Sequence, residues 1–312
     1  MASPELTQVL HVLRASMPKD LPASIDAERD VPRLREMLEA FPAELPPSVR
    51  RIDVSAEGVP AEWIVVPGAD PRRRLLYLHG GAYVAGSRRS HRGLAGRIGK
   101  ATGFSVLLVD YRLAPEHPLP AAVDDALAAL RFVRTHGPSL DGPEPSVRSD
   151  ATHVAVGGDS AGGGLTLLTL LAARDRGLCA DVAFTISAWT DLANTGESRT
   201  TRRALDPMLP AHLLDSAAAV AIGSADPRSP HVSPLYADLV GLPPLLMQVG
   251  DVEILLDDTR LVAEKARAVG VEVELEVWPD LFHVWHIFAA MLPEGRAAIA
   301  RIGEFVRAKT TR

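Results

Sequence analysis

The 312-residue sequence has one cysteine, no long apolar run and no extended basic segment. Cys179 therefore cannot form an internal disulfide, and it stands near a turn with no histidine beside it. We expect it to be a small buried or half-buried side chain rather than a nucleophile.

No apolar run approaches the roughly 20 residues of a membrane-spanning helix. The first residues also lack the basic start and apolar stretch of a signal peptide. These absences predict a cytoplasmic protein without integral membrane association.

The sequence also lacks a concentration of positive charge. The formal net charge is -6, and the longest basic run is Arg72-Arg73-Arg74. Nucleic acid is therefore not an expected partner, because its phosphates bind to a concentrated basic surface. The chain is nevertheless long enough to bury a large core, either as one α/β domain or as one domain with an insertion.

Apolar runs typical of buried strands alternate with helical segments along most of the chain. Such alternation predicts an α/β fold with a mostly parallel central sheet flanked by helices. The alternation is absent at the start and is lost again in one later segment. The chain thus divides into an N-terminal helical arm (1–48), a first part of the core (49–188), an inserted helical lid (189–232) and a second part of the core (233–312).

A glycine-flanked serine stands between a short strand-like run and a helical segment. The sequence Gly158-Asp159-Ser160-Ala161-Gly162 fits the pattern G-x-S-x-G. Where this pattern joins a strand to a helix, the sharp turn exposes the serine oxygen at the helix N-terminus and requires small neighbours. Backbone N–H groups there favour negative charge. Taken alone, the pattern also fits a glycine-rich turn that carries a serine by chance.

A second glycine motif lies upstream. His79-Gly80-Gly81-Ala82 follows an apolar strand-like run and is close to the HGGG-type motif of lipases and esterases. Glycines let the backbone approach a substrate, so the N–H groups of Gly80 and Gly81, with that of Ala161, are the expected donors to an oxyanion. A plain glycine turn is the alternative reading.

A serine nucleophile also needs a base and an acid that orients it, which in α/β-hydrolases follow in the order serine, acid, histidine. His283 lies in the loop after the last predicted strand and fits that position, whereas His286 is expected to face elsewhere. A buried structural histidine is the alternative for His283. Two carboxylates, Asp251 and Glu253, lie at the end of an earlier strand, where open α/β sheets bind ligands. Spacing alone does not separate these two.

Two further acidic residues follow in the same segment. Asp257 and Asp258 stand at the start of a predicted helix, where carboxylates commonly cap free N–H groups and complement the helix dipole. We expect them to serve that local role rather than to take part in chemistry.

Three motifs in this order resemble the hormone-sensitive-lipase-like family of α/β-hydrolases, which includes many bacterial esterases. They are His79-Gly80-Gly81-Ala82, Tyr111-Arg112-Leu113-Ala114-Pro115-Glu116-His117 and Gly158-Asp159-Ser160-Ala161-Gly162-Gly163. The resemblance implies an α/β-hydrolase fold in which the arm and the inserted segment form a helical cap. It implies no metal and no cofactor, and dimerisation through an edge strand. The family's acidic segment, Asp-Pro-Leu-x-Asp-Glu, aligned with residues 253–258, places the catalytic acid at Glu253.

The resulting hypothesis is a serine esterase that acts on small-molecule esters of short- to medium-chain acids. Ser160 is the nucleophile, His283 the base and Glu253 the orienting acid. Two readings remain beside it: an amidase or acyltransferase with the same residues, and a ligand-binding protein on a hydrolase scaffold. The candidates for lining the substrate pocket, each of which fits a core position equally well, are Tyr83, Trp189, Phe282 and Trp285.

Overall fold

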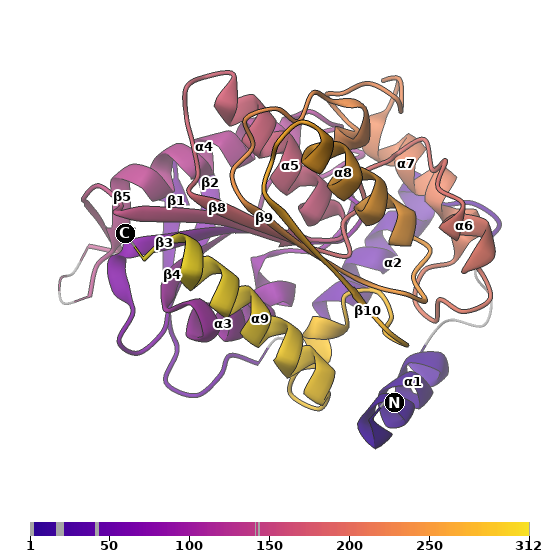
Figure 1. Cartoon of the computed structure of the whole chain (residues 1–312), viewed down its shortest axis with the longest axis horizontal. Helices are drawn as coiled ribbons and strands as arrows, with labels where there is room; N and C mark the ends of the chain where they lie inside the picture. The colour runs from indigo at the N-terminus through magenta and orange to yellow at the C-terminus, as the bar shows by residue number, and fades with distance from the viewer. Residues whose placement is uncertain (1–2, 17–21, 41–43, 141, 143, 312) are drawn as a thin grey trace.

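A twisted sheet runs through the centre of the molecule (Figure 1). The computed structural model describes residues 3–16, 22–40, 44–140, 142 and 144–311. Within them, eight strands form one sheet in the order β1-β2-β4-β3-β7-β8-β9-β10. From β4 to β10 neighbouring strands are parallel, while β1 and β2 form an antiparallel hairpin at one edge. The strands are β1 (Arg50–Ala56), β2 (Val59–Val65), β3 (Asp70–Leu78), β4 (Phe104–Val109), β7 (His153–Asp159), β8 (Val182–Ile186), β9 (Leu245–Gly250) and β10 (Val273–Trp278).

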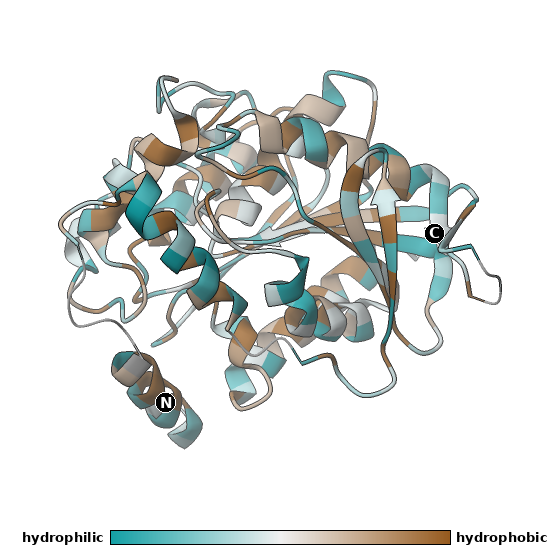
Figure 2. Ribbon diagram, turned by 180° about the vertical axis from the view of Figure 1, so that it is seen from behind, coloured by the Kyte–Doolittle hydropathy of each residue, from teal (hydrophilic) through white to brown (hydrophobic). Residues whose placement is uncertain are grey.

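Helices cover both faces of this sheet. Helices α3 (Arg88–Thr102) and α9 (Pro293–Lys309) lie on one face, and α4 (Ala121–Thr135), α5 (Ala161–Arg174) and α8 (Leu256–Ala268) on the other (Figure 1). Alternate residues of a strand serve the two layers: Leu76 and Leu78 pack with α4 and α5, while Leu75 and Tyr77 pack with α3 and α9. Figure 2 shows hydrophobic residues along the strands between the layers. The predicted α/β-hydrolase fold is confirmed.

Helix ends follow local sequence. Ser87 caps α3 by accepting hydrogen bonds from the N–H groups of Arg89 and Ser90, and Gly103 ends that helix in the left-handed conformation (φ 77°). Helix α9 begins with a proline, whose missing N–H would be unpaired in the first turn in any case. These signals fix where the helices that cover the sheet begin and end.

The N-terminal helices pack against distant parts of the chain. Helix α1 (Pro4–Ser16) buries Leu6, Val9 and Leu13 in a cluster with Phe282 and Trp285. At roughly 1.5–3 kcal/mol for each fully buried large apolar side chain, such contacts hold α1 on the segment after β10. The second helix is α2 (Ala27–Glu39), and its Val31 clusters with the loop after β3.

The segment 189–232 contains short helices rather than strands: α6 (Ser198–Thr201), η1 (Ala211–Leu213) and α7 (Leu214–Ile222). The remaining short elements are β5 (His136–Pro138), β6 (Ser146–Arg148), η2 (Pro234–Tyr236) and η3 (Trp285–Phe288). The division into arm, cap and core stays a prediction, as does dimerisation through an edge strand. None of the described helices is both long and apolar enough to cross a bilayer.

Two local predictions are wrong. The side chain of Cys179 is exposed rather than buried, because it lies in the surface turn between α5 and β8. Asp257 and Asp258 do lie in the first turn of α8, as predicted for acidic residues at the positive end of the helix dipole, but the predicted capping is absent. Asp257 accepts a hydrogen bond from the N–H of Ser198, and Asp258 from the N–H groups of Thr190 and Asp191. Both carboxylates thus hold the segment that follows β8.

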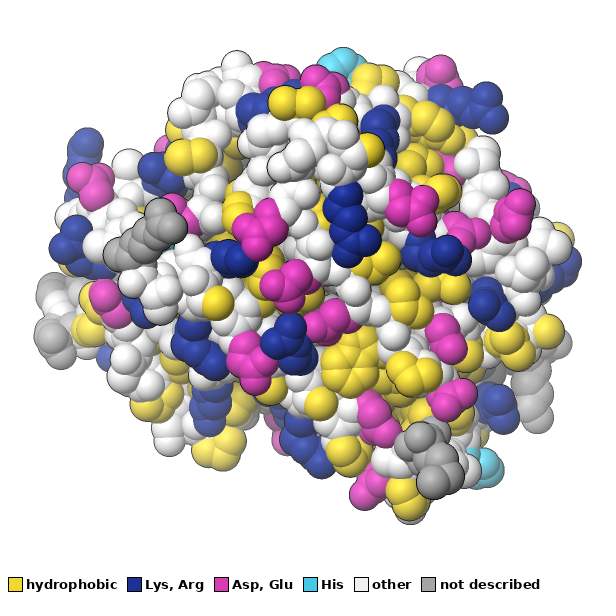
Figure 3. Space-filling view, viewed as in Figure 1, with side chains coloured by type: hydrophobic (Ala, Val, Ile, Leu, Met, Phe, Trp, Pro, Cys, Tyr) yellow, Lys and Arg dark blue, Asp and Glu magenta, His cyan; other side chains and the backbone are white. Residues whose placement is uncertain are grey.

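The face of the molecule seen in Figure 3 carries lysine and arginine side chains interspersed with aspartate and glutamate. Hydrophobic side chains are scattered between them on that face. The mixture fits the small net charge of the whole chain.

Candidate active site

Ser160 forms the turn between β7 and α5, the strand–turn–helix arrangement that its sequence predicts. Its backbone has a left-handed φ of 53° with ψ −123°, and its N–H donates to the Ile186 carbonyl at 2.8 Å. The turn leaves no room for larger neighbours. A β-carbon on Gly158 would lie 2.4 Å from the Gly162 carbonyl oxygen, and one on Gly162 would lie 2.1 Å from that of Leu78. The strained turn therefore depends on both glycines.

The loop after β3 packs directly on this turn. A β-carbon on Gly80 would lie 3.1 Å from the Ser160 β-carbon, so the two glycine motifs meet as predicted. Ala161 is the first residue of α5, where helical N–H groups have no intrahelical partner. The N–H groups of Gly81 and Ala82, both partly exposed, have no hydrogen-bond partner among the described residues. N–H groups without a partner among the described residues thus lie in the loop and at the helix start that meet at Ser160.

Gly80 does not fit its predicted role as an oxyanion donor. Its N–H points into the protein interior, where the Gly80 nitrogen lies 3.3 Å from His91 Nε2, the same atom that lies 3.3 Å from Asp159 Oδ2. The sequence motif indicates which residues form the loop, but it does not indicate where each N–H points. Helix α3 places His91 next to the N–H of Gly80. Ala82 (φ 55°) replaces Gly80 as a candidate donor beside Gly81 and Ala161.

A cluster of buried polar side chains packs against the loop that follows β3. The Tyr77 hydroxyl donates to Asp159 Oδ1 at 2.7 Å, and His91 Nε2 lies 3.3 Å from Asp159 Oδ2. Burial would raise the pKa of Asp159, but the charge of His91 and hydrogen bonds from His91 and Tyr77 outweigh it and lower that pKa. The His79 ring stacks on Tyr111 at 4.2 Å, and the Tyr111 hydroxyl donates to the His79 carbonyl at 2.6 Å. Asp159 is therefore a structural partner of the loop.

His283 and Glu253 form a buried pair. His283 Nδ1 lies 2.9 Å from Glu253 Oε2, with Glu253 fully buried and His283 only 4% exposed. Glu253 Oε1 accepts two further hydrogen bonds, from the Gly250 N–H at 2.6 Å and the Ser187 hydroxyl at 2.7 Å. The Glu253 carboxylate therefore has three hydrogen-bond partners, and one of them is Nδ1 of the His283 imidazole.

Opposing effects act on the acidity of this pair. Burial raises the pKa of the Glu253 carboxyl, and the hydrogen bond and charge of His283 only partly oppose that shift. For His283, burial would lower the pKa, but the hydrogen bond and charge of Glu253 outweigh it, so the pKa lies above its usual 6.5. The carboxylate thus stabilises the imidazolium that a general base becomes.

The other candidates for base and acid lie elsewhere. Asp251 Oδ1 accepts the Asp280 N–H at 2.7 Å and so closes the turn after β10. His286 faces away from Glu253, as expected, and its Nε2 lies 2.8 Å from Gln248 Oε1. Burial lowers the pKa of His286 to about 3, so this imidazole is neutral. Of the two carboxylates that spacing left open, the structure brings Glu253 to His283.

The three central side chains come from one edge of the sheet. Ser160 follows β7, Glu253 follows β9 and His283 follows β10, and the carboxyl ends of parallel strands meet at the same edge. Neither Ser160 Oγ nor His283 Nε2 has a hydrogen-bond partner among the described residues. These two atoms are therefore free to meet each other or a substrate.

The four predicted pocket residues fall into two groups. The Tyr83 and Trp189 rings lie 6.3 Å apart, and the Trp189 N–H donates to the Ser160 carbonyl at 3.0 Å, so this pair adjoins the serine turn. Phe282 and Trp285 belong instead to the buried cluster with α1, although Phe282 immediately precedes His283. Contact of any of the four with a substrate stays a prediction.

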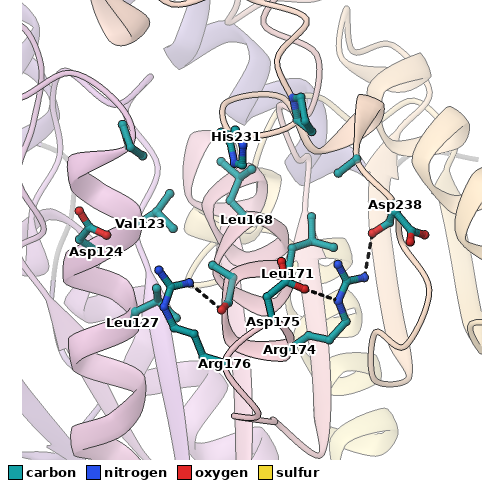
Figure 4. Close-up of a pocket in the computed structure, with 14 residues that line it drawn as sticks. Val123, Asp124, Leu127, Leu168, Leu171, Arg174, Asp175, Arg176, His231 and Asp238 are labelled. Atoms are coloured by element: carbon teal, nitrogen blue, oxygen red, sulfur yellow. Dashed lines mark hydrogen bonds and ion pairs between the residues drawn. The ribbon is translucent and has the colours of Figure 1, made fainter.

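A surface hollow of about 380 Å³ lies away from these residues (Figure 4). Val123 and Leu127 of α4 and Leu168 and Leu171 of α5 form its apolar floor, and Asp124 is one of several charged residues at its rim. None of the predicted site residues lines it. The candidate active site is therefore the serine turn and not this hollow.

Sequence reasoning missed two residues of the site, His91 and Ser187. His91 lies inside a helix and carries no local signal. Ser187 did carry one, because it is a polar residue directly after a buried strand, the same signal that drew attention to Asp251 and Glu253.

Comparison with known proteins identifies relatives of the whole chain. A family model described as "alpha/beta hydrolase fold" matches residues 75–287. An acetyl-hydrolase of Streptomyces hygroscopicus is 45% identical over 251 residues, which are 80% of each chain. A crystal structure of EstE5 soaked with p-nitrophenyl butyrate has a TM-score of 0.89 and 40% identity over 100% of both chains. An esterase from the bacterial hormone-sensitive lipase family has a TM-score of 0.86 and 44% identity over 99% of both chains.

Proposed function

Because the chain belongs to the hormone-sensitive-lipase-like family of α/β-hydrolases and is a carboxylic ester hydrolase, we propose that Ser160, His283 and Glu253 catalyse its reaction. Ser160 Oγ attacks the ester carbonyl while His283 Nε2 accepts its proton, and Glu253 orients the imidazole through Nδ1. His283 then protonates the leaving alcohol, and water hydrolyses the acyl-enzyme by the same steps.

The oxyanion of each tetrahedral intermediate is bound by backbone N–H groups. We assign this role to Gly81, Ala82 and Ala161, which belong to the loop and the helix start that meet at Ser160 and whose N–H groups have no partner within the described part of the chain. Loss of one such donor typically costs about 10²–10³ in kcat. The backbone supplies these donors, but Gly81 admits no side chain, because a β-carbon there would lie 2.1 Å from the Ala85 carbonyl oxygen.

One observation carries the proposal. A buried carboxylate holds the imidazole of His283 at 2.9 Å, at the same sheet edge as a serine in a strained turn at a helix N-terminus. A serine hydroxyl is a weak nucleophile at neutral pH and needs this combination of base and orienting acid. A protein that only binds a ligand needs none of it.

We further propose that α1, α2 and the segment 189–232 form a cap over the site and that the acyl group is short. Helix α1 packs against the residues around His283, and α2 packs against the loop of Gly81. The acetyl-hydrolase and the EstE5 crystal soaked with a butyrate ester support small acyl groups.

Hydrolysis of p-nitrophenyl esters of graded acyl length tests this function. We expect kcat/KM to be highest for acetate to hexanoate and to fall at least about tenfold for laurate, since a longer chain exceeds a small acyl pocket. Matched p-nitroanilides serve as the amide control and are expected to react far more slowly.

Other outcomes point to other functions. A preference for anilides would indicate an amidase. Ester binding without turnover, measured by calorimetry, would favour a ligand-binding protein and contradict the proposal.

A further inference from the structure

Ser187 is a fully buried residue that directly follows β8, the strand between those that lead to Ser160 and Glu253. Its N–H donates to the Gln248 carbonyl at 2.7 Å, and its φ is 49°. A non-glycine residue rarely adopts this left-handed conformation, and such strain is commonly retained where surrounding structure requires a side chain in one direction.

The Ser187 hydroxyl bonds to Glu253 and to the residue that follows His283. Its Oγ donates to Glu253 Oε1 at 2.7 Å and accepts the Val284 N–H at 3.1 Å. Val284 immediately follows His283 and is itself left-handed, with φ 49°. One hydroxyl therefore links the side chain of the acid to the backbone next to the base.

The hydrogen bonds on Glu253 explain why this tie matters. Oε2 faces His283, while Oε1 is held by the Gly250 N–H and by Ser187. Without the hydroxyl, Oε1 keeps one donor, and a buried carboxylate with fewer donors becomes a stronger base. The Val284 N–H would also lose its partner in a buried place, which costs free energy unless the loop moves.

We propose that Ser187 is a positioning residue for catalysis: its hydroxyl fixes the Glu253 carboxylate and the His283 loop in the geometry that proton transfer requires. Ser187 does not touch the reacting atoms, and it acts through Glu253 and His283. This inference rests on the proposed function of that pair.

The variants Ser187→Ala and Ser187→Gly test the role of the hydroxyl. Both remove it, but glycine adopts a φ of 49° without strain, whereas alanine keeps the β-carbon. For both, we expect kcat for p-nitrophenyl acetate to fall by about 10- to 100-fold, as for loss of a hydrogen bond to a charged group, with KM within about twofold.

The pH profile of kcat/KM separates positioning from a merely structural role. In the unchanged protein, activity is lost as pH falls through the pKa of His283, which lies above its usual 6.5, because a protonated imidazole cannot act as base. A Glu253 carboxylate with one donor fewer holds the proton between it and His283 Nδ1 more tightly, which raises the pKa of His283. In both variants, the acidic limb of the pH profile, where activity falls as His283 is protonated, should therefore move up by about one pH unit. Asp206 and Asp159 also act electrostatically on His283, and neither is changed.

Ser233→Ala is the matched control. Ser233 is equally buried and makes two hydrogen bonds, accepting the Leu192 N–H at 2.8 Å and donating to the Pro227 carbonyl at 2.6 Å. It contacts neither Glu253 nor His283. We expect a lower Tm, unchanged kcat and an acidic limb in its original place.

Two results would overturn the inference. One is a Ser187→Ala variant with unchanged kcat and an unmoved acidic limb. The other is full activity in Ser187→Gly with poor activity in Ser187→Ala, which would show that backbone strain and not the hydroxyl is at work. Failure of the proposed function itself would appear separately, as activity retained in Ser160→Ala.

Discussion

Replacing Ser160 with alanine is expected to lower kcat for p-nitrophenyl acetate by about 10⁴–10⁶-fold. The substitution removes the nucleophile, so no acyl-enzyme can form. Residual turnover would come from the oxyanion donors and from substrate binding alone. Because alanine occupies the same turn, with its φ of 53°, KM and the strand–turn–helix geometry should change little.

The control for this prediction is folding. Circular dichroism and thermal melting of Ser160→Ala should match those of the unchanged protein, since the hydroxyl has no partner among the described residues to lose. A folded variant that retains more than about one per cent of the activity would contradict the assignment of the nucleophile.

The second large effect is expected at the acid. Glu253→Gln should lower kcat by about 10³–10⁴-fold, because an amide opposite Nδ1 no longer stabilises the imidazolium and can favour the wrong tautomer of His283. The side chain keeps its shape, so the loss reflects charge and hydrogen bonding. The readout is kcat and KM with the same acetate ester.

Asp251→Asn is the matched comparison for the acid. Asp251 lies two residues before Glu253 but bonds to the Asp280 N–H, so its loss should change kcat by no more than about threefold. If Asp251→Asn is inactive while Glu253→Gln is nearly normal, the assignment of the acid is wrong.

Much of the fold follows from sequence because periodicity and glycine placement are local signals. The apolar run 182–186 predicts a strand and the helical pattern of residues 121–135 predicts a helix, and the structure gives β8 and α4 these same bounds. The turn at Ser160 was also predictable, since Gly158 and Gly162 occupy positions that admit no β-carbon. Local chemistry determined these elements, and tertiary contacts did not alter them.

Tertiary contacts decided the rest. Gly80 was expected to donate to an oxyanion, but its N–H points into the protein interior toward His91 of α3. Asp258 was expected to cap α8, but it binds the N–H groups of Thr190 and Asp191. Spacing could not separate Asp251 from Glu253, because both leave the same strand and only the three-dimensional path of the loop brings one to His283. In each case the partner belongs to another element of the fold.

The most direct test of the central claim is covalent labelling with phenylmethylsulfonyl fluoride, followed by mass spectrometry of tryptic peptides. An activated serine displaces fluoride, forms a bond from its oxygen to sulfur and passes its proton to the base. We predict a single sulfonyl group per chain, on Ser160, with loss of activity in proportion to labelling and no label in Ser160→Ala. Proportionate inactivation with the label on another residue would contradict the account.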